Sequence, residues 1–204
     1  SDLLLECWIQ PYGCANTIVK MVADYYNVAI PADLAGAMLC AILSDTVLFK
    51  SPTCTEFDKN AAAELAKIAS VADTESLGMD MFKAKSNLDA SPRDLIFRDF
   101  KDFDMGGKKI GIGQLELISL SMVTPELKKA LQDELNAVKA EGRHSAILVL
   151  TDIMKEGSEL LLSSDDENKV IEALGTKKAD VMWMPGVMSR KKQVVPPLQG
   201  AFKA

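Results

Sequence analysis

Apolar residues in the first third of the chain recur every three or four positions, which is the spacing of amphipathic helices. This spacing predicts a helix over residues 15–26 and further helices over residues 31–45, 55–68 and 74–83. Before them, residues 3–8 form a short apolar run that is typical of a strand. The first third should therefore be mainly helical, with one strand at its start.

Beyond residue 92 the pattern changes to alternating helices and strands. Ser164 is predicted to cap one of these helices and Gly175 to end it. Such alternation indicates the α/β fold class. The predicted strands cover residues 109–123, 145–152, 158–162 and 179–184, and the predicted helices cover residues 91–100, 124–140 and 164–174.

Polar residues gather between these two parts, around residues 85–92. We therefore predict two domains, residues 1–85 and residues 93–204, joined by a hinge linker over residues 86–92. Flexible polar linkers of this kind allow domains to move relative to each other.

The overall charge bears on the partners. The net charge is −6, whereas a nucleic-acid-binding protein usually presents a basic surface. No apolar run reaches the roughly 20 residues of a membrane span, and the start of the chain does not resemble a signal peptide. The four cysteines show no Cys-x-x-Cys pair, which argues against zinc and for free thiols. We expect a cytoplasmic protein that binds neither nucleic acid nor membranes.

Asp45 is the first candidate for chemistry. It stands within an apolar run at the predicted C-terminal end of a helix, where the helix dipole disfavours a negative charge. Its place in the apolar run also indicates burial, and a buried charge needs a compensating cation, which a metal ion would supply. The alternative is a carboxylate that bonds to a neighbouring loop or to Lys50.

Basic residues form the second candidate. Arg190, Lys191 and Lys192 are consecutive, and Gln193 follows them. Arginine presents a planar fork to phosphate oxygens, and lysine presents a mobile point charge. Lys101 lies between two phenylalanines and could also reach an anion. Solvated surface charge is the alternative for the run, and snorkelling, with an apolar stem packed on the protein and the amine in water, is the favoured alternative for Lys101.

Other motifs are weaker. Asp152 ends an apolar strand, and we interpret it as a strand-end cap rather than a site residue. Gly111 and Gly113 lack the third glycine of a dinucleotide-binding loop. The single histidine, His144, lies far from Cys14 in the sequence, so the two make a poor nucleophile and base pair.

Five segments, in order along the chain, carry the motifs of one enzyme family. Residues 41–55 read AILSDTVLFKSPTCT, and residues 189–193 read SRKKQ. Residues 11–18, 99–103 and 151–153 match further segments, although Phe100 replaces an alanine. Together they resemble the manganese-dependent (family II) inorganic pyrophosphatases of the DHH phosphoesterase superfamily.

The resemblance implies a two-domain α/β enzyme that hydrolyses pyrophosphate to two phosphates and forms a homodimer. Residues 1–85 would be the C-terminal part of a parallel-sheet DHH domain, and residues 93–204 would be a complete DHH-associated domain. The first domain would hold two Mn²⁺ (or Co²⁺) ions, with Mg²⁺ accompanying the substrate. Two such ions activate a bridging water for attack.

By matched position, the resemblance also implies roles for single residues. Asp45 would be a metal ligand. Catalytic contacts to the phosphates would come from Lys101, Arg190 and Lys191, which stabilise charge on the phosphoryl oxygens. Lys192 and Gln193 would complete the substrate-binding motif. The linker would act as the hinge for closure over pyrophosphate.

The histidine-containing ligand motifs of the family are absent from this sequence, and His144 matches none of them. We therefore expect the chain to be the C-terminal portion of a longer enzyme, with impaired metal binding and little or no activity alone. Two alternatives remain. One is a non-catalytic phosphate-binding module, and the other is a polyphosphate or oligonucleotide phosphoesterase of the same superfamily.

Overall fold

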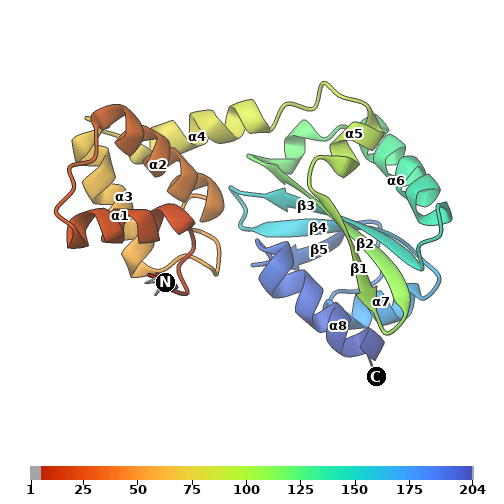
Figure 1. The fold of residues 1–204 in the computed structure, drawn as a ribbon. Coiled ribbons are helices and arrows are strands. Elements are labelled where there is room, and N and C mark those ends of the chain that lie inside the picture. Colours follow the sequence, from red (N-terminus) through yellow and green to blue (C-terminus); the bar gives the residue numbers. More distant parts are fainter. Residues whose placement is uncertain (1–5, 204) are drawn as a thin grey trace. The chain divides into compact units, whose positions relative to one another are not determined.

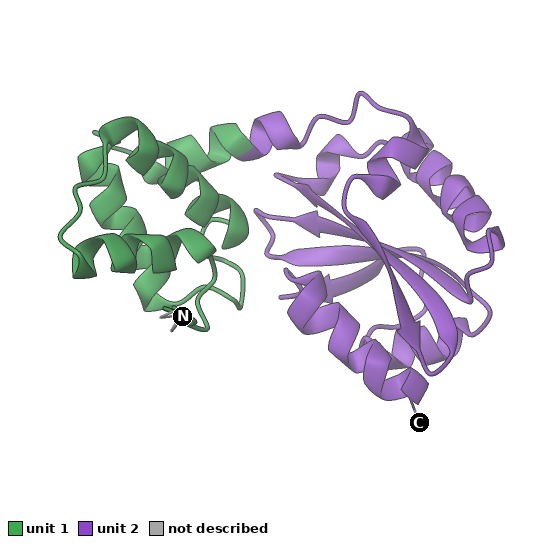
Figure 2. Ribbon diagram, viewed as in Figure 1, with its two compact units in different colours: residues 1–81 green, residues 82–204 purple. Residues whose placement is uncertain are grey.

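A computed structural model describes residues 6–203. It divides the chain into two compact units, residues 1–81 and residues 82–204 (Figure 2). The division falls inside helix α4 (Thr74–Lys85), a few residues before the predicted linker. The predicted domains, residues 1–85 and 93–204, stay a prediction; the boundary between the two units lies at residues 81 and 82.

The predicted linker begins with residues that are bonded to the second unit. The side chain of Ser86 is fully buried and accepts the N–H of Ile118 at 3.2 Å. The guanidinium of Arg98 donates to the carbonyls of Lys85 and Asn87 at 3.1 and 2.9 Å. The hinge over residues 86–92 stays a prediction. Its first two residues, Ser86 and Asn87, are hydrogen-bonded to the second unit.

The first unit is helical over its described residues, 6–81. Four helices form it: α1 (Ala15–Tyr25), α2 (Ala32–Asp45), α3 (Glu56–Ile68) and the start of α4 (Figure 1). Leu39, Ile42, Leu43 and Leu65 are fully buried between them. The predicted helices are confirmed. Residues 3–5 of the predicted strand lie outside the described residues, and residues 6–8 belong to no strand.

The second unit is built on one mixed sheet in the order β1-β2-β3-β4-β5 (Figure 1). Strands β2 and β3 are parallel, and helix α6 (Pro125–Ala140) makes the crossover between them. All other neighbours are antiparallel. The strands are β1 (Phe100–Met105), β2 (Lys108–Leu117), β3 (Ser145–Asp152), β4 (Gly157–Ser164) and β5 (Met182–Pro185).

Helices cover both faces of this sheet (Figure 1). One face carries α5 (Pro92–Phe97) and α6, and the other carries α7 (Glu167–Ala173) and α8 (Val195–Lys203). Every residue of β3 is buried, because β3 is central and covered on both sides. Two short turns complete the unit, η1 (Leu120–Met122) and the π-helical η2 (Arg190–Val194).

Some boundaries differ from the prediction. β1 was not predicted, because only some of its residues are apolar. Asp166, not Ser164, caps α7, since Ser164 still belongs to β4. Helix α8 was not predicted either, because Pro196 and Pro197 read as a break. Prolines are tolerated in a first helical turn, where the missing N–H has no partner to lose.

Two expectations about the whole chain can be compared with the described residues. None of their helices has the length and apolar character that crossing a membrane requires. All four cysteines are free thiols, as predicted.

Candidate functional site

The three lysines that are predicted to bind phosphate are exposed in the second unit. Lys191 and Lys192 are exposed on η2, and Lys101 is exposed on β1. On β1, Lys101 alternates with Asp102 and shares its face with Phe103 and Met105, which pack on the α7–α8 side. Lys101 therefore lies on the face of the sheet that packs against α7 and α8.

Arg190 joins η2 to the start of β1. Its Nη1 donates to the carbonyl oxygens of Asp99 and Ile112 at 2.6 and 3.0 Å, and its Nη2 donates to the Asp99 carboxylate at 2.8 Å. Ile112 is the register partner of Lys101. Arg190, a predicted phosphate contact, is only 8% exposed. Its bonds to the protein use three of the five guanidinium N–H groups.

Gln193 is bonded to backbone atoms of the preceding loop. Its Oε1 accepts the N–H groups of Met188 and Ser189 at 2.9 Å each. Its Nε2 donates to the carbonyl of Gly186 at 2.7 Å. The Ser189 hydroxyl accepts the N–H of Lys192 at 3.4 Å as the N-cap of η2. The motif thus holds its own turn in shape and leaves two lysines exposed.

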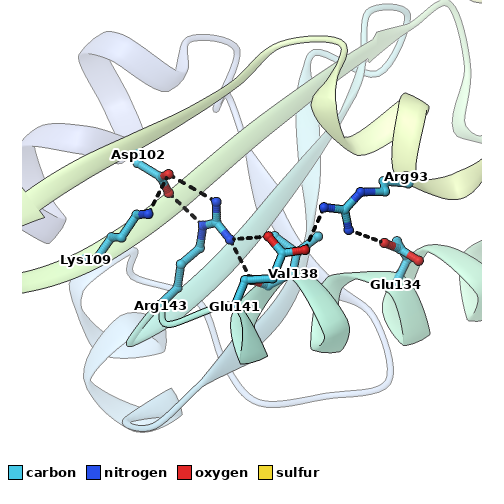
Figure 3. A network of polar contacts seen from close by, with 7 residues as sticks. All are labelled: Arg93, Asp102, Lys109, Glu134, Val138, Glu141 and Arg143. Carbon is cyan, nitrogen blue, oxygen red and sulfur yellow. Dashed lines mark hydrogen bonds and ion pairs between the residues drawn. The ribbon is translucent and has the colours of Figure 1, made fainter.

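The opposite face of β1 is fixed by an ion-pair network (Figure 3). The Asp102 carboxylate accepts from Nε and Nη2 of Arg143 at 2.7 and 3.1 Å. The Nζ of Lys109 lies 3.2 Å from Oδ2 of the same carboxylate. Burial opposes ionisation, yet hydrogen bonds from Arg143 and Lys109 outweigh it and lower the pKa of Asp102. Arg143 also donates to the carbonyl of Val138 at 2.7 Å, which anchors the network to α6. Sequence reasoning missed Arg143, because its partner Asp102 lies 41 residues earlier in the chain.

Asp45 lies in the first unit, at the last position of α2. Its neighbours Thr46 and Val47 are buried, but Asp45 itself is exposed, so the expected burial of its charge is wrong. The Cys14 thiol is its neighbour. Burial and the hydrogen bond to Asp45 raise the pKa of Cys14 to about 11.

The segment after Asp45 has an uncommon backbone. Val47, Leu48 and Phe49 have φ angles of 50°, 52° and 64°, a left-handed turn of three residues with side chains. The Thr46 hydroxyl supports it by donating to the Ile42 carbonyl at 2.7 Å and accepting the Phe49 N–H at 3.2 Å. Each such residue costs about 1–2 kcal/mol. Strain of this kind clusters at functional sites, which favours a role for this segment.

Asp58 organises the loop that contains Cys14. Its carboxylate accepts from the N–H groups of Gly13, Cys14 and Thr55 at 3.0, 3.3 and 2.8 Å. The hydroxyls of Thr17 and Thr55 donate to it at 2.6 and 2.7 Å. Burial opposes ionisation, but these bonds prevail and lower the pKa of Asp58. Asp58 also forms a capping box with Thr55 at the start of α3.

A metal centre needs several ligands close together. Among residues 6–203, no three histidine, cysteine, aspartate or glutamate side chains lie together in a way that could hold a metal ion. His144 is in the second unit, where its Nδ1 bonds to the Ser145 hydroxyl at 2.9 Å. Burial and the charge of Lys108 lower the pKa of His144. The described residues alone therefore do not make a complete Mn²⁺ site.

Asp152 is a strand-end cap, as predicted. It is fully buried, and its Oδ2 accepts the N–H of Leu120 at 2.9 Å. Its Oδ1 accepts the N–H of Lys155 at 2.8 Å. The carboxylate thus closes the turn after β3.

Comparison with known proteins identifies one domain and several relatives. A family model described as the DHHA2 domain matches residues 79–201. A relative from Archaeoglobus fulgidus, named "Probable manganese-dependent inorganic pyrophosphatase", is 49% identical over 195 residues. A relative from Methanocaldococcus jannaschii, named "Manganese-dependent inorganic pyrophosphatase", is 47% identical over 210 residues.

These alignments cover 94% and 96% of this chain but 60% and 66% of the two relatives. The chain thus spans less than two thirds of their length. A solved structure, named "Crystal structure of Methanococcus jannaschii putative family II inorganic pyrophosphatase", is similar over the whole chain. It has 40% sequence identity and a TM-score of 0.86, and this chain covers 69% of it.

Proposed function

This chain belongs to the manganese-dependent (family II) inorganic pyrophosphatases, and we propose that it supplies the pyrophosphate-binding residues for hydrolysis of pyrophosphate to two phosphates. The observation that carries this proposal is the placement of the basic residues. Lys191 and Lys192 are exposed on a self-capped turn, and Arg190 ties that turn to the strand that carries Lys101.

The lysines suit a substrate with several negative charges. Lys101 and Lys191 each offer three mobile N–H donors to phosphoryl oxygens. Such charge-assisted bonds stabilise charge that develops on the leaving phosphate. Arg190 retains two N–H groups for an anion after its bonds to the protein, while Gln193 acts through the turn that it holds.

Manganese is the ion that the relatives' names give, and we propose Asp45 as one of its ligands. Bound ions of this kind supply an activated water. A complete centre needs ligands beyond those that residues 6–203 bring together. We therefore retain the prediction that this chain alone has little or no hydrolytic activity with Mn²⁺.

Pyrophosphate binding by the 204-residue chain tests the proposal. Titration calorimetry should detect binding, and Lys101→Ala or Lys191→Ala should each weaken it about tenfold or more, since a hydrogen bond to a charged group contributes about 1.5–3 kcal/mol. Lys129→Ala, which removes an exposed lysine of α6, is the matched control. Equal affinity in all four proteins, or no binding at all, would refute the proposal.

The second candidate is a non-catalytic phosphate-binding module, because the described residues hold no complete metal site. Full turnover in a protein that also supplies the remaining ligands would exclude it. A preference for long polyphosphate over pyrophosphate would instead favour the sister phosphoesterases. Homodimer formation, a cytoplasmic location and the absence of nucleic-acid binding remain parts of the proposal.

A further inference from the structure

Three neighbouring strands change from apolar to polar side chains towards the same end of the sheet, with Thr151 opposite Ser158 and Gln114 opposite Val149. The change occurs on the face that packs against α7 and α8. We call Gln114, Thr151 and Ser158 the polar row; they are 9%, 0% and 0% exposed. They continue the apolar stripes Ile110 and Ile112 on β2, Ile147 and Val149 on β3, and Leu162 and Leu160 on β4.

The polar row forms a chain of hydrogen bonds with one direction. Gln114 Nε2 donates to the Thr151 hydroxyl at 3.0 Å. The Ser158 hydroxyl donates to the carbonyl of Val187 at 2.6 Å. Ser158 must therefore accept from Thr151, whose hydroxyl lies 2.9 Å away. Each member is satisfied, so the row has a single arrangement.

The row ends on the backbone of the loop that precedes the basic residues. Gln114 Nε2 also donates to the carbonyl of Met188 at 3.2 Å, and Gln114 Oε1 accepts the N–H of Arg190 at 3.2 Å. With the bond from Ser158 to Val187, side chains of the sheet bond to three backbone groups of this loop. Gln193 bonds to further backbone groups of the same loop.

We propose that the polar row positions the basic turn for anion binding; this inference rests on the proposed function. Apolar side chains would continue the stripes and pack without desolvating polar groups, so three buried polar residues are a cost to the core. The polar row, however, fixes the direction in which the side chains of Lys191 and Lys192 leave the backbone of the turn. A turn that is ordered before the anion arrives loses less entropy on binding.

Two substitutions at one position separate positioning from packing. Thr151→Val keeps the shape and removes the hydroxyl, whereas Thr151→Ser keeps the hydroxyl and removes a methyl group. Amide hydrogen exchange over residues 187–192 and pyrophosphate affinity are measured for the 204-residue chain. We expect Thr151→Val to speed the exchange and to weaken binding about tenfold, and Thr151→Ser to remain close to the parent.

Gln114→Leu should behave like Thr151→Val. Its control is Gln132→Leu, the same change at a side chain of α6 that donates to the carbonyl of Leu162 at 3.0 Å. That bond lies away from the basic turn, so affinity should stay unchanged in the control.

The outcomes are separable. A packing role predicts the reverse order, with Thr151→Ser more affected than Thr151→Val, and that order would overturn the inference. Unchanged exchange, or unchanged affinity, in a folded Thr151→Val protein would overturn it as well. If the parent chain binds no pyrophosphate, the proposed function fails, and the exchange rates in the Thr151 pair still decide whether the row orders the turn.

Discussion

Among single residues, the candidates for anion contact divide by what their side chains already bind. The side chains of Lys101 and Lys191 are exposed. Those of Arg190 and Gln193 make most of their hydrogen bonds to the protein itself. The sequence indicated all four as one group. It could not separate them, because the partner of Arg190, Asp99, lies 91 residues earlier in the chain.

Asp58 supports a prediction at this scale. Asp58→Asn replaces one accepting oxygen by an NH₂ group, so the half-buried N–H of Gly13 or the buried hydroxyl of Thr17 loses its acceptor. We expect the first unit to lose about 2–3 kcal/mol of stability, since an unsatisfied buried group costs about 1–3 kcal/mol. Hydrogen exchange of the α1 and α3 amides in urea measures this loss.

The exposed Asp33 provides the control for that experiment. It accepts the N–H of Leu34 at 2.9 Å on the surface of α2, so Asp33→Asn should change stability little. Equal exchange in the two variants would contradict the central role of Asp58.

At the scale of elements, the β1–β2 hairpin sets the place of Lys101. Gly106 and Gly107 form its turn, with φ angles of 63° and 75°. Such angles favour glycine. The two glycines differ in their surroundings: a Cβ on Gly106 would lie 2.1 Å from the carbonyl oxygen of Phe202, and a Cβ on Gly107 would meet no atom within 4 Å.

This difference predicts unequal effects of the same substitution. Gly107→Ala should cost about 1 kcal/mol, the strain of a left-handed alanine. Gly106→Ala should cost clearly more, because the backbone of α8 must also move. Urea unfolding of the two variants, followed by circular dichroism, measures both. A larger loss for Gly107→Ala would show that the hairpin does not pack on α8 as described.

At the scale of the whole molecule, the chain consists of two units with separate hydrophobic cores. Carboxyl groups in both units are held ionised by nearby donors. Six of them have pKa values below the ordinary value for their residue type: Glu6, Asp58, Asp102, Glu126, Glu141 and Asp165.

These lowered pKa values predict instability in acid. A carboxyl group with a lowered pKa contributes stability above its unfolded pKa, and this contribution is lost as the pH falls through its folded value. The melting temperature should therefore fall steadily below about pH 4.5, with protons taken up on unfolding. Calorimetry between pH 7 and pH 3 checks this, and a constant melting temperature over that range would contradict it.

Periodicity along the chain was sufficient to determine most helices, the central strands β3 and β4, and the α/β class, because these depend on local spacing of apolar residues. The motif residues around Asp45 and Arg190 likewise indicated the family. Tertiary structure alone decided that Asp45 is exposed, that Arg190 is buried, and that the polar row meets the basic turn. Those facts depend on contacts between residues distant in sequence, which no local pattern encodes.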